Sequence, residues 1–114
     1  MNRIVCIDTE YDARYTDLGV ARLSCMTSSF EPGHAEIVGP GGAVKLWAGW
    51  VSDPTVAVLG HSVYNDVAVL AQESHRRAEG VDCVPGFGPH WELAHRLYES
   101  DRVIDTEIHQ RLTQ

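Results

Sequence analysis

Short apolar runs separated by polar breaks are the main pattern along this chain. Residues 3–7 and 55–59 are rich in β-branched side chains, and each run stops abruptly, the first at Asp8 and the second at Gly60. Runs of this length and composition are typical of buried strands rather than of helices. Weaker runs predict three more strands, at residues 18–23, 35–38 and 102–105.

Apolar residues at helical spacing fill much of the remaining chain. They predict helices over 44–51, 90–99 and 106–112, and a longer one beginning near Asn65 and ending near Glu79. Asn65 or Asp66 is the expected N-cap of that longer helix. Polar or Gly/Pro-rich stretches predict loops at 11–17, 27–34, 39–42 and 80–89. The order predicts one α/β domain with a mixed sheet, in which antiparallel opening strands precede parallel crossovers and helices flank the sheet.

Composition and charge narrow the function classes. The 114 residues suffice for a single core, and 44% hydrophobic with 22% charged residues is typical of a globular protein. Nine basic residues against sixteen acidic ones give a net charge of −7, which excludes a protein that coats nucleic acid by bulk electrostatics. An enzyme that grips one strand end through bound cations stays possible, because a carboxylate site is acidic until the cation arrives.

Three cysteines at wide spacing, with no Cys-x-x-Cys, disfavour a disulfide scaffold and a zinc ribbon. We therefore expect a reducing intracellular compartment, nucleus or cytoplasm, with no membrane partner, since no apolar run approaches the length of a membrane span. Cys6 is expected to be buried, Trp47 and Trp50 to pack in the core, and Arg76 and Arg77 to form a solvated helix end.

Carboxylates follow three of the predicted strands. Asp8 and Glu10 are two residues apart after the first strand, so both side chains should point to one face and attract a divalent cation. Asp66 opens the helix after the 55–59 strand, at the sheet edge where α/β proteins gather ligands. Asp105 ends the last strand, where helix capping is the default interpretation.

In this order and spacing, these motifs resemble the DEDD superfamily of 3′→5′ exonucleases, which have a ribonuclease H-like fold. Asp8-Thr9-Glu10 matches the first motif, His61 through Asp66 to Leu70 looks like the second, and Val103-Ile104-Asp105-Thr106 resembles the strand that follows. The residues of the second motif are most similar to those of the RNA-exonuclease branch and of a fungal branch of ribonuclease H-like proteins. His61 belongs to the second motif because a buried strand leads into it, and it is not assigned as the general base.

The resemblance implies hydrolysis of phosphodiester bonds with two Mg²⁺ or Mn²⁺ ions about 4 Å apart. Asp8 would bridge the ions, Glu10 would hold the first and Asp66 the second. The implied substrate is a single-stranded nucleic-acid 3′ end, with RNA preferred over DNA. Predicted substrate contacts are Thr9, Tyr11, His61 and Asn65.

The family's third motif, a His or Tyr with a final Asp, finds no counterpart after Thr106. The domain is therefore expected to be incomplete at its C-terminus, with a bare sheet face that favours a homodimer. The alternative function is a catalytically inactive ribonuclease H-like module that binds nucleic acid or protein. A metal-dependent phosphohydrolase of small substrates ranks lower, because Asp8-Thr9-Glu10 departs from the Asp-x-Asp that such enzymes require.

Overall fold

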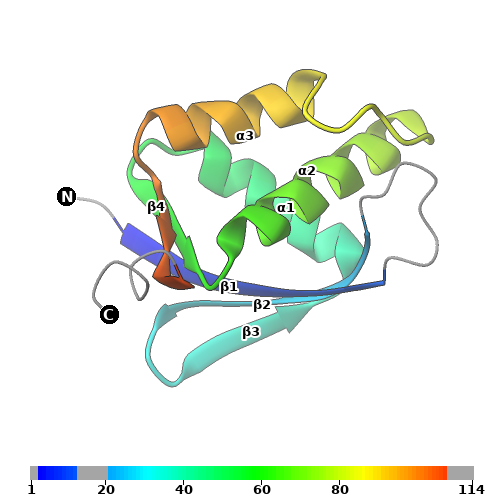
Figure 1. Cartoon of the computed structure of the whole chain (residues 1–114). Coiled ribbons are helices and arrows are strands. Elements are labelled where there is room, and N and C mark those ends of the chain that lie inside the picture. Colours follow the sequence, from blue (N-terminus) through cyan, green and yellow to red (C-terminus); the bar gives the residue numbers. More distant parts are fainter. Residues whose placement is uncertain (1–2, 13–20, 108–114) are drawn as a thin grey trace.

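The computed structural model describes residues 3–12 and 21–107, and they form a mixed five-stranded sheet (Figure 1). The strand order is β3-β2-β1-β4-β5; β1, β2 and β3 pair antiparallel, and β4 and β5 join β1 in parallel. This confirms the predicted mixed α/β sheet, with antiparallel opening strands followed by parallel ones. The strands are β1 (Arg3–Asp12), β2 (Arg22–Glu31), β3 (His34–Val38), β4 (Val56–Gly60) and β5 (Val103–Asp105).

Three helices cover one face of this sheet (Figure 1). They are α1 (Pro40–Ser52), α2 (Val63–Glu79) and α3 (Pro89–Glu99). The core lies between them and the sheet, and Trp47 and Trp50 are both buried there, as predicted. Among the described residues no helix covers the other face of the sheet, and none of the helices is long and apolar enough to cross a membrane.

The central strand β1 alternates strictly between these two faces. Val5, Ile7 and Thr9 are buried under the helices, whereas Ile4 and Cys6 are exposed on the uncovered face. The expectation of a buried Cys6 was wrong, because helices cover only one face of β1 and Cys6 points to the other face. The pleat instead gives each face every second residue.

The opening strands differ from the prediction in position and length. The first strand extends five residues beyond Ile7, to Asp12, and β2 runs through most of the segment that was predicted as a loop at 27–34. The second half of β2 carries small hydroxyl side chains such as Ser28 and Ser29, so it lacks the apolar run that predicts a strand. The turn itself is only Pro32-Gly33, with Gly33 at a φ of +81°. Residues 13–20 and 108–114, which include half of the predicted strand at 18–23 and most of the predicted helix at 106–112, lie outside the described residues.

Two helix starts also lie earlier than predicted. Pro40 opens α1, so only Gly39 acts as the chain breaker, because proline fits the first helical turn where its missing N–H costs nothing. Ser62 precedes α2 in the left-handed conformation, so neither Asn65 nor Asp66 is its N-cap. Both residues lie inside the first turns of α2.

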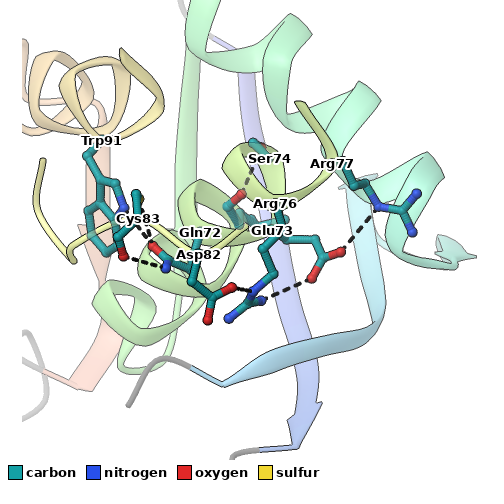
Figure 2. Close-up of polar contacts among 9 residues, drawn as sticks. Gln72, Glu73, Ser74, Arg76, Arg77, Asp82, Cys83 and Trp91 are labelled. Carbon is teal, nitrogen blue, oxygen red and sulfur yellow. Dashed lines mark hydrogen bonds and ion pairs between the residues drawn. The ribbon is translucent and has the colours of Figure 1, made fainter. Parts of the chain in front are cut away.

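Polar contacts fasten the loop at 80–88 to α2 (Figure 2). The fully buried Gln72 donates to the carbonyl of Cys83 at 2.8 Å and accepts the indole N–H of Trp91 at 2.9 Å. Arg76 is also buried and pairs with Glu73 at 3.2 Å and with Asp82. The prediction of a solvated arginine pair was therefore wrong for Arg76, since its side chain is an internal tie between helix and loop.

Arg102 joins the end of α1 to the start of β5. Its guanidinium is buried and donates to the backbone carbonyls of Trp50, Val51, Asp53 and Val56 at 2.7–3.3 Å. Three of these four carbonyls lie at the end of α1, where backbone donors become scarce. The Trp50 carbonyl also accepts the N–H of Asp53 at 3.2 Å, and the Asp53 carbonyl that of Val56 at 3.1 Å. The planar fork of arginine suits this role because its donors point in several fixed directions.

Replacing Arg102 with methionine should lower the free energy of unfolding by about 3 kcal/mol, because buried carbonyls lose charged donors while the apolar stem is kept. Lysine at this position should recover only part of the loss, since a single ammonium reaches fewer carbonyls. Urea unfolding at neutral pH measures both variants. Arg96→Met, on the exposed side of α3, is the matched control and should stay within about 0.5 kcal/mol of wild type. Equal stability of Arg102→Met and wild type would contradict this role.

Candidate functional site

The candidate site lies where the parallel strands β1, β4 and β5 reach the carboxyl edge of the sheet. The register pairs Cys6 with Leu59 and Gly60 with Asp105. Asp8 therefore lies just beyond the last residue of β4, and Asp105 is level with that residue. Helix α2 begins three residues after Gly60, so this edge also receives its N-terminus. The chain thus brings three strand ends and one helix start together, as α/β ligand sites require.

Asp8 and Glu10 share one side of β1. Both side chains are exposed on the face that the helices leave uncovered, while Thr9 between them is buried on the helix side. This agrees with the predicted convergence of the two acids. The strand continues to Asp12, so the pair lies within a paired strand rather than at the start of a loop. A paired backbone holds the two carboxylates more firmly than a loop would.

Asp66 reaches the same edge from the opposite side of the sheet. One of its carboxylate oxygens accepts the backbone N–H of Thr9 at 3.2 Å and also the Thr9 hydroxyl. Burial is the largest influence on Asp66 and raises the pKa of its carboxyl, and the hydrogen bonds from Thr9 oppose that rise. The negative charges of Asp8 and Asp105 raise the pKa of Asp66 further.

Asp105 organises the turn between β4 and α2. Its carboxylate accepts the backbone N–H groups of Ser62 at 3.0 Å, Val63 at 3.2 Å and Glu107 at 2.9 Å. The default expectation of helix capping is confirmed, and it extends to α2 as well as to the residues after β5. The same bonds hold Ser62 at a φ of +53°, a conformation that costs a non-glycine residue free energy. The Ser62 hydroxyl donates to Glu107 as well.

Gly60 is required by the closeness of the elements at this edge. A β-carbon on Gly60 would lie 3.0 Å from a methyl carbon of Val63 and 3.1 Å from the carbonyl oxygen of Ile7. Backbone cannot yield at such a distance, so any side chain here would push α2 away from β1. Close packing of this kind is what keeps Asp66 within reach of Thr9.

An open pocket of about 310 Å³ lies beside Asp8. Its walls include Cys6, Leu59, His61 and Thr106. The imidazole Nδ1 of His61 is 3.1 Å from the Thr106 hydroxyl, which in turn donates weakly to the Gly60 carbonyl at 3.4 Å. The ring of His61 is thereby oriented at the pocket wall, a place compatible with its predicted contact with substrate.

The other predicted substrate contacts are placed less favourably. The Thr9 side chain is buried, and its hydroxyl donates a hydrogen bond to Asp66. Thr9 therefore holds Asp66 in position. Tyr11 is exposed and Asn65 is half-buried, and neither residue lines the pocket beside Asp8. For these three residues, contact with substrate stays a prediction.

Tyr98 was missed as a member of this region, whereas Thr106 was already part of the motif at 103–106. Tyr98, near the end of α3, has a phenol pKa that is raised by burial and then by the charges of Asp105 and Asp66. Its distance of seven residues from Asp105 in the sequence gave no signal, because the turn that brings α3 back to β5 has no motif of its own.

The carboxylates of this site are the ligand type that a hard divalent cation prefers, but their arrangement fits such a cation less well. Asp8 and Glu10 supply exposed carboxylate oxygens on one face, and Mg²⁺ commonly binds one or two carboxylates while keeping waters. Within residues 3–12 and 21–107, however, no three His, Cys, Asp or Glu side chains are grouped closely enough to hold a metal. Asp66 is turned to Thr9 across the strand. The residues thus fit one cation held by the Asp8–Glu10 pair, and they do not fit the two-ion centre that was expected.

Comparison with known proteins gives a limited result. No protein-family model and no curated protein matches the sequence. Two solved structures of Brucella melitensis NrnC, one of them with bound Mg²⁺, match with TM-scores of 0.46 and 0.47 and 18% sequence identity. Each match covers 89% of this chain and 74% or 73% of the other. At this identity the similarity assigns no role to any residue of the candidate site.

The raised pKa of the Asp66 carboxyl predicts a pH-dependent cost to folding. Because the folded protein holds this proton more tightly than the unfolded chain, stability falls as pH rises through the unfolded and then the folded pKa. Asp66→Asn keeps an oxygen for Thr9 and removes the charge, so it should equal wild type near pH 3 and be at least as stable at pH 7.

Asp66→Ala should instead lose about 1–3 kcal/mol at both pH values, because Thr9 is left with a buried unpaired hydroxyl and N–H. Urea unfolding in EDTA, which keeps cations out of the comparison, measures all three proteins. An Asp66→Asn protein that is less stable than wild type at pH 7 would show that the charge stabilises the fold.

Proposed function

We propose that this domain is a divalent-metal-dependent 3′→5′ exonuclease that hydrolyses phosphodiester bonds at single-stranded 3′ ends, with RNA preferred over DNA. The observation that carries the proposal is the meeting of three acids at one sheet edge: Asp8 and Asp105 lie at the ends of strands on either side of β4, and Asp66 binds Thr9 next to Asp8. Mutually repelling carboxylates at a strained turn lower stability, and such a cost is usual at functional sites. The motif resemblance supplies the direction of cleavage and the preference for RNA.

Each part of the edge has a distinct task in this proposal. Asp8 and Glu10 would hold the cation on the uncovered face, and the bound cation would polarise the phosphoryl group and lower the pKa of a water. Asp66, which Thr9 holds in position, would add a negative charge on the helix side of β1. Asp105 would keep α2 and its Asp66 in place through the turn at Ser62. The pocket between Asp8 and His61 would receive the end of the strand.

A second function is favoured by a specific observation. Asp66 is engaged with Thr9, and the described residues offer no ready group of three metal-binding side chains. A domain that keeps the fold and the acidic edge but performs no hydrolysis would look the same. The alternative is therefore a ribonuclease H-like module that binds nucleic acid or protein without cutting it.

Digestion of a single-stranded RNA, labelled at its 5′ end, in Mn²⁺ tests the first function. The full chain should give a ladder that shortens from the 3′ end, and Asp8→Asn should reduce the rate by roughly a hundredfold or more, since a metal contributes several kcal/mol to transition-state stabilisation. Glu79→Gln, an equal loss of charge at the far end of α2, is the matched control and should cut like wild type.

Two further substrates separate the outcomes. Phosphorothioate linkages at the 3′ end should stop the ladder, and a DNA strand of the same sequence should be shortened more slowly. Cleavage that survives Asp8→Asn, or that occurs inside the blocked strand, would contradict an exonuclease at this edge. Retention of the RNA in a gel-shift assay, with no cleavage by any variant, would instead support the binding module.

A further inference from the structure

A second hollow lies on the helix-covered side of the sheet, away from Asp8 and Glu10. It is a cleft of about 250 Å³ between the end of the β2–β3 hairpin and α1. Ser28 belongs to the face of β2 that turns toward α1, because it is buried and pairs with the buried Ile7. A ligand in this cleft therefore leaves the uncovered face free. The cleft is lined by Ser28, Ser29, Phe30, Glu31, His34, Glu36, Leu46 and Trp50.

Aromatic rings form one wall of this cleft. Phe30 is 41% exposed, and its ring meets the ring of Trp50 edge to face, with centroids 6.2 Å apart and an interplanar angle of 80°. Trp50 is buried in the core, so it fixes the orientation of the Phe30 ring beside it. An exposed phenylalanine held in this way offers a π surface at little cost in side-chain entropy.

Carboxylates also line this cleft. Glu31 and Glu36 line the cleft from the two strands of the hairpin, and neither lysine nor arginine is among its lining residues. The hydroxyls of Ser28 and Ser29 add neutral acceptors. Although His34 stands near the two acids, the described residues contain no group of three such side chains placed for a metal ion. The charge of the cleft therefore favours a cation, and its aromatic wall, without a group of three metal-binding side chains among the described residues, suits an organic one.

The protein already shows which organic cation suits the Phe30 ring. The guanidinium carbon of Arg3 lies 4.7 Å from the centroid of that ring, while a guanidinium nitrogen of Arg3 is 3.7 Å from an Asp53 carboxylate oxygen. Planar guanidinium groups stack on aromatic rings and pair with carboxylates at once, which a compact ammonium does less well. Arg3 does not line the cleft, so the cation that it supplies to Phe30 lies outside the space beside Glu31 and Glu36.

We propose that this cleft binds an arginine side chain from a basic segment of a partner protein. The guanidinium would lie between the Phe30 ring and the carboxylates of Glu31 and Glu36, and the methylene stem would rest on Leu46. This inference does not depend on nuclease activity, since the cleft shares no lining residue with the pocket beside Asp8.

Nuclear magnetic resonance on the ¹⁵N-labelled full chain provides the test, with acetyl-Gly-Arg-Gly-amide as the probe. The peptide should shift the indole N–H resonance of Trp50 and the amides of the hairpin tip. The indole of Trp91, which donates to Gln72 inside the protein, should not move and serves as an internal control. The same peptide with citrulline, which keeps the shape of arginine and lacks its charge, should bind at least about tenfold more weakly.

Variants of exposed residues locate the binding. Glu36→Gln and Phe30→Leu should each weaken the arginine peptide by about threefold to fivefold, and Glu79→Gln should leave its affinity unchanged. Unaltered far-ultraviolet circular dichroism shows that each variant is folded. Equal binding of the citrulline peptide, an unmoved Trp50 resonance, or equal loss in Glu79→Gln would overturn the proposal.

Discussion

The pleat of β1 is the constraint on which the rest of this structure depends. One strand gives Val5 and Ile7 to the core and, on its other side, presents Asp8 and Glu10 to solvent. Thr9 belongs to the core side and carries the polar link to Asp66. A shift of the strand by one residue would bury the two acids and expose the core residues. The sheet therefore fixes the fold and the candidate site through the same alternation.

The turn after β4 transmits that order to the helices. Asp105 binds the backbone of Ser62 and Val63 from the neighbouring strand, and Gly60 lets α2 approach β1 closely. Asp66 thereby remains against Thr9 despite the burial that raises its pKa. At the other end of the molecule, Arg102 ties α1 to β5 by binding helix-end carbonyls. The buried Arg102 and the half-buried Asp105 thus set both ends of the helical layer.

Local patterns predicted the parts of the fold that depend on local chemistry. The apolar runs before Asp8 and Gly60 identified β1 and β4, and the spacing of acids identified the edge where they meet. The hydroxyl-rich strand β2 was placed too early, because its burial comes from pairing with β1 rather than from its own apolar content. The exposure of Cys6, the burial of Arg76 and the approach of Tyr98 to Asp66 depend on which elements pack together. A single sequence carries no local signal for such contacts.

The central claim is that the paired acids on the uncovered face of β1 bind a divalent cation. Titration of the ¹⁵N-labelled protein with Mn²⁺ tests it directly, because the paramagnetic ion broadens nearby amide resonances whether or not the protein cuts RNA. Broadening should be strongest at Asp8 and Glu10, extend to the start of α2, and disappear in Asp8→Asn. Broadening centred elsewhere on the acidic surface, or unchanged in that variant, would contradict the account.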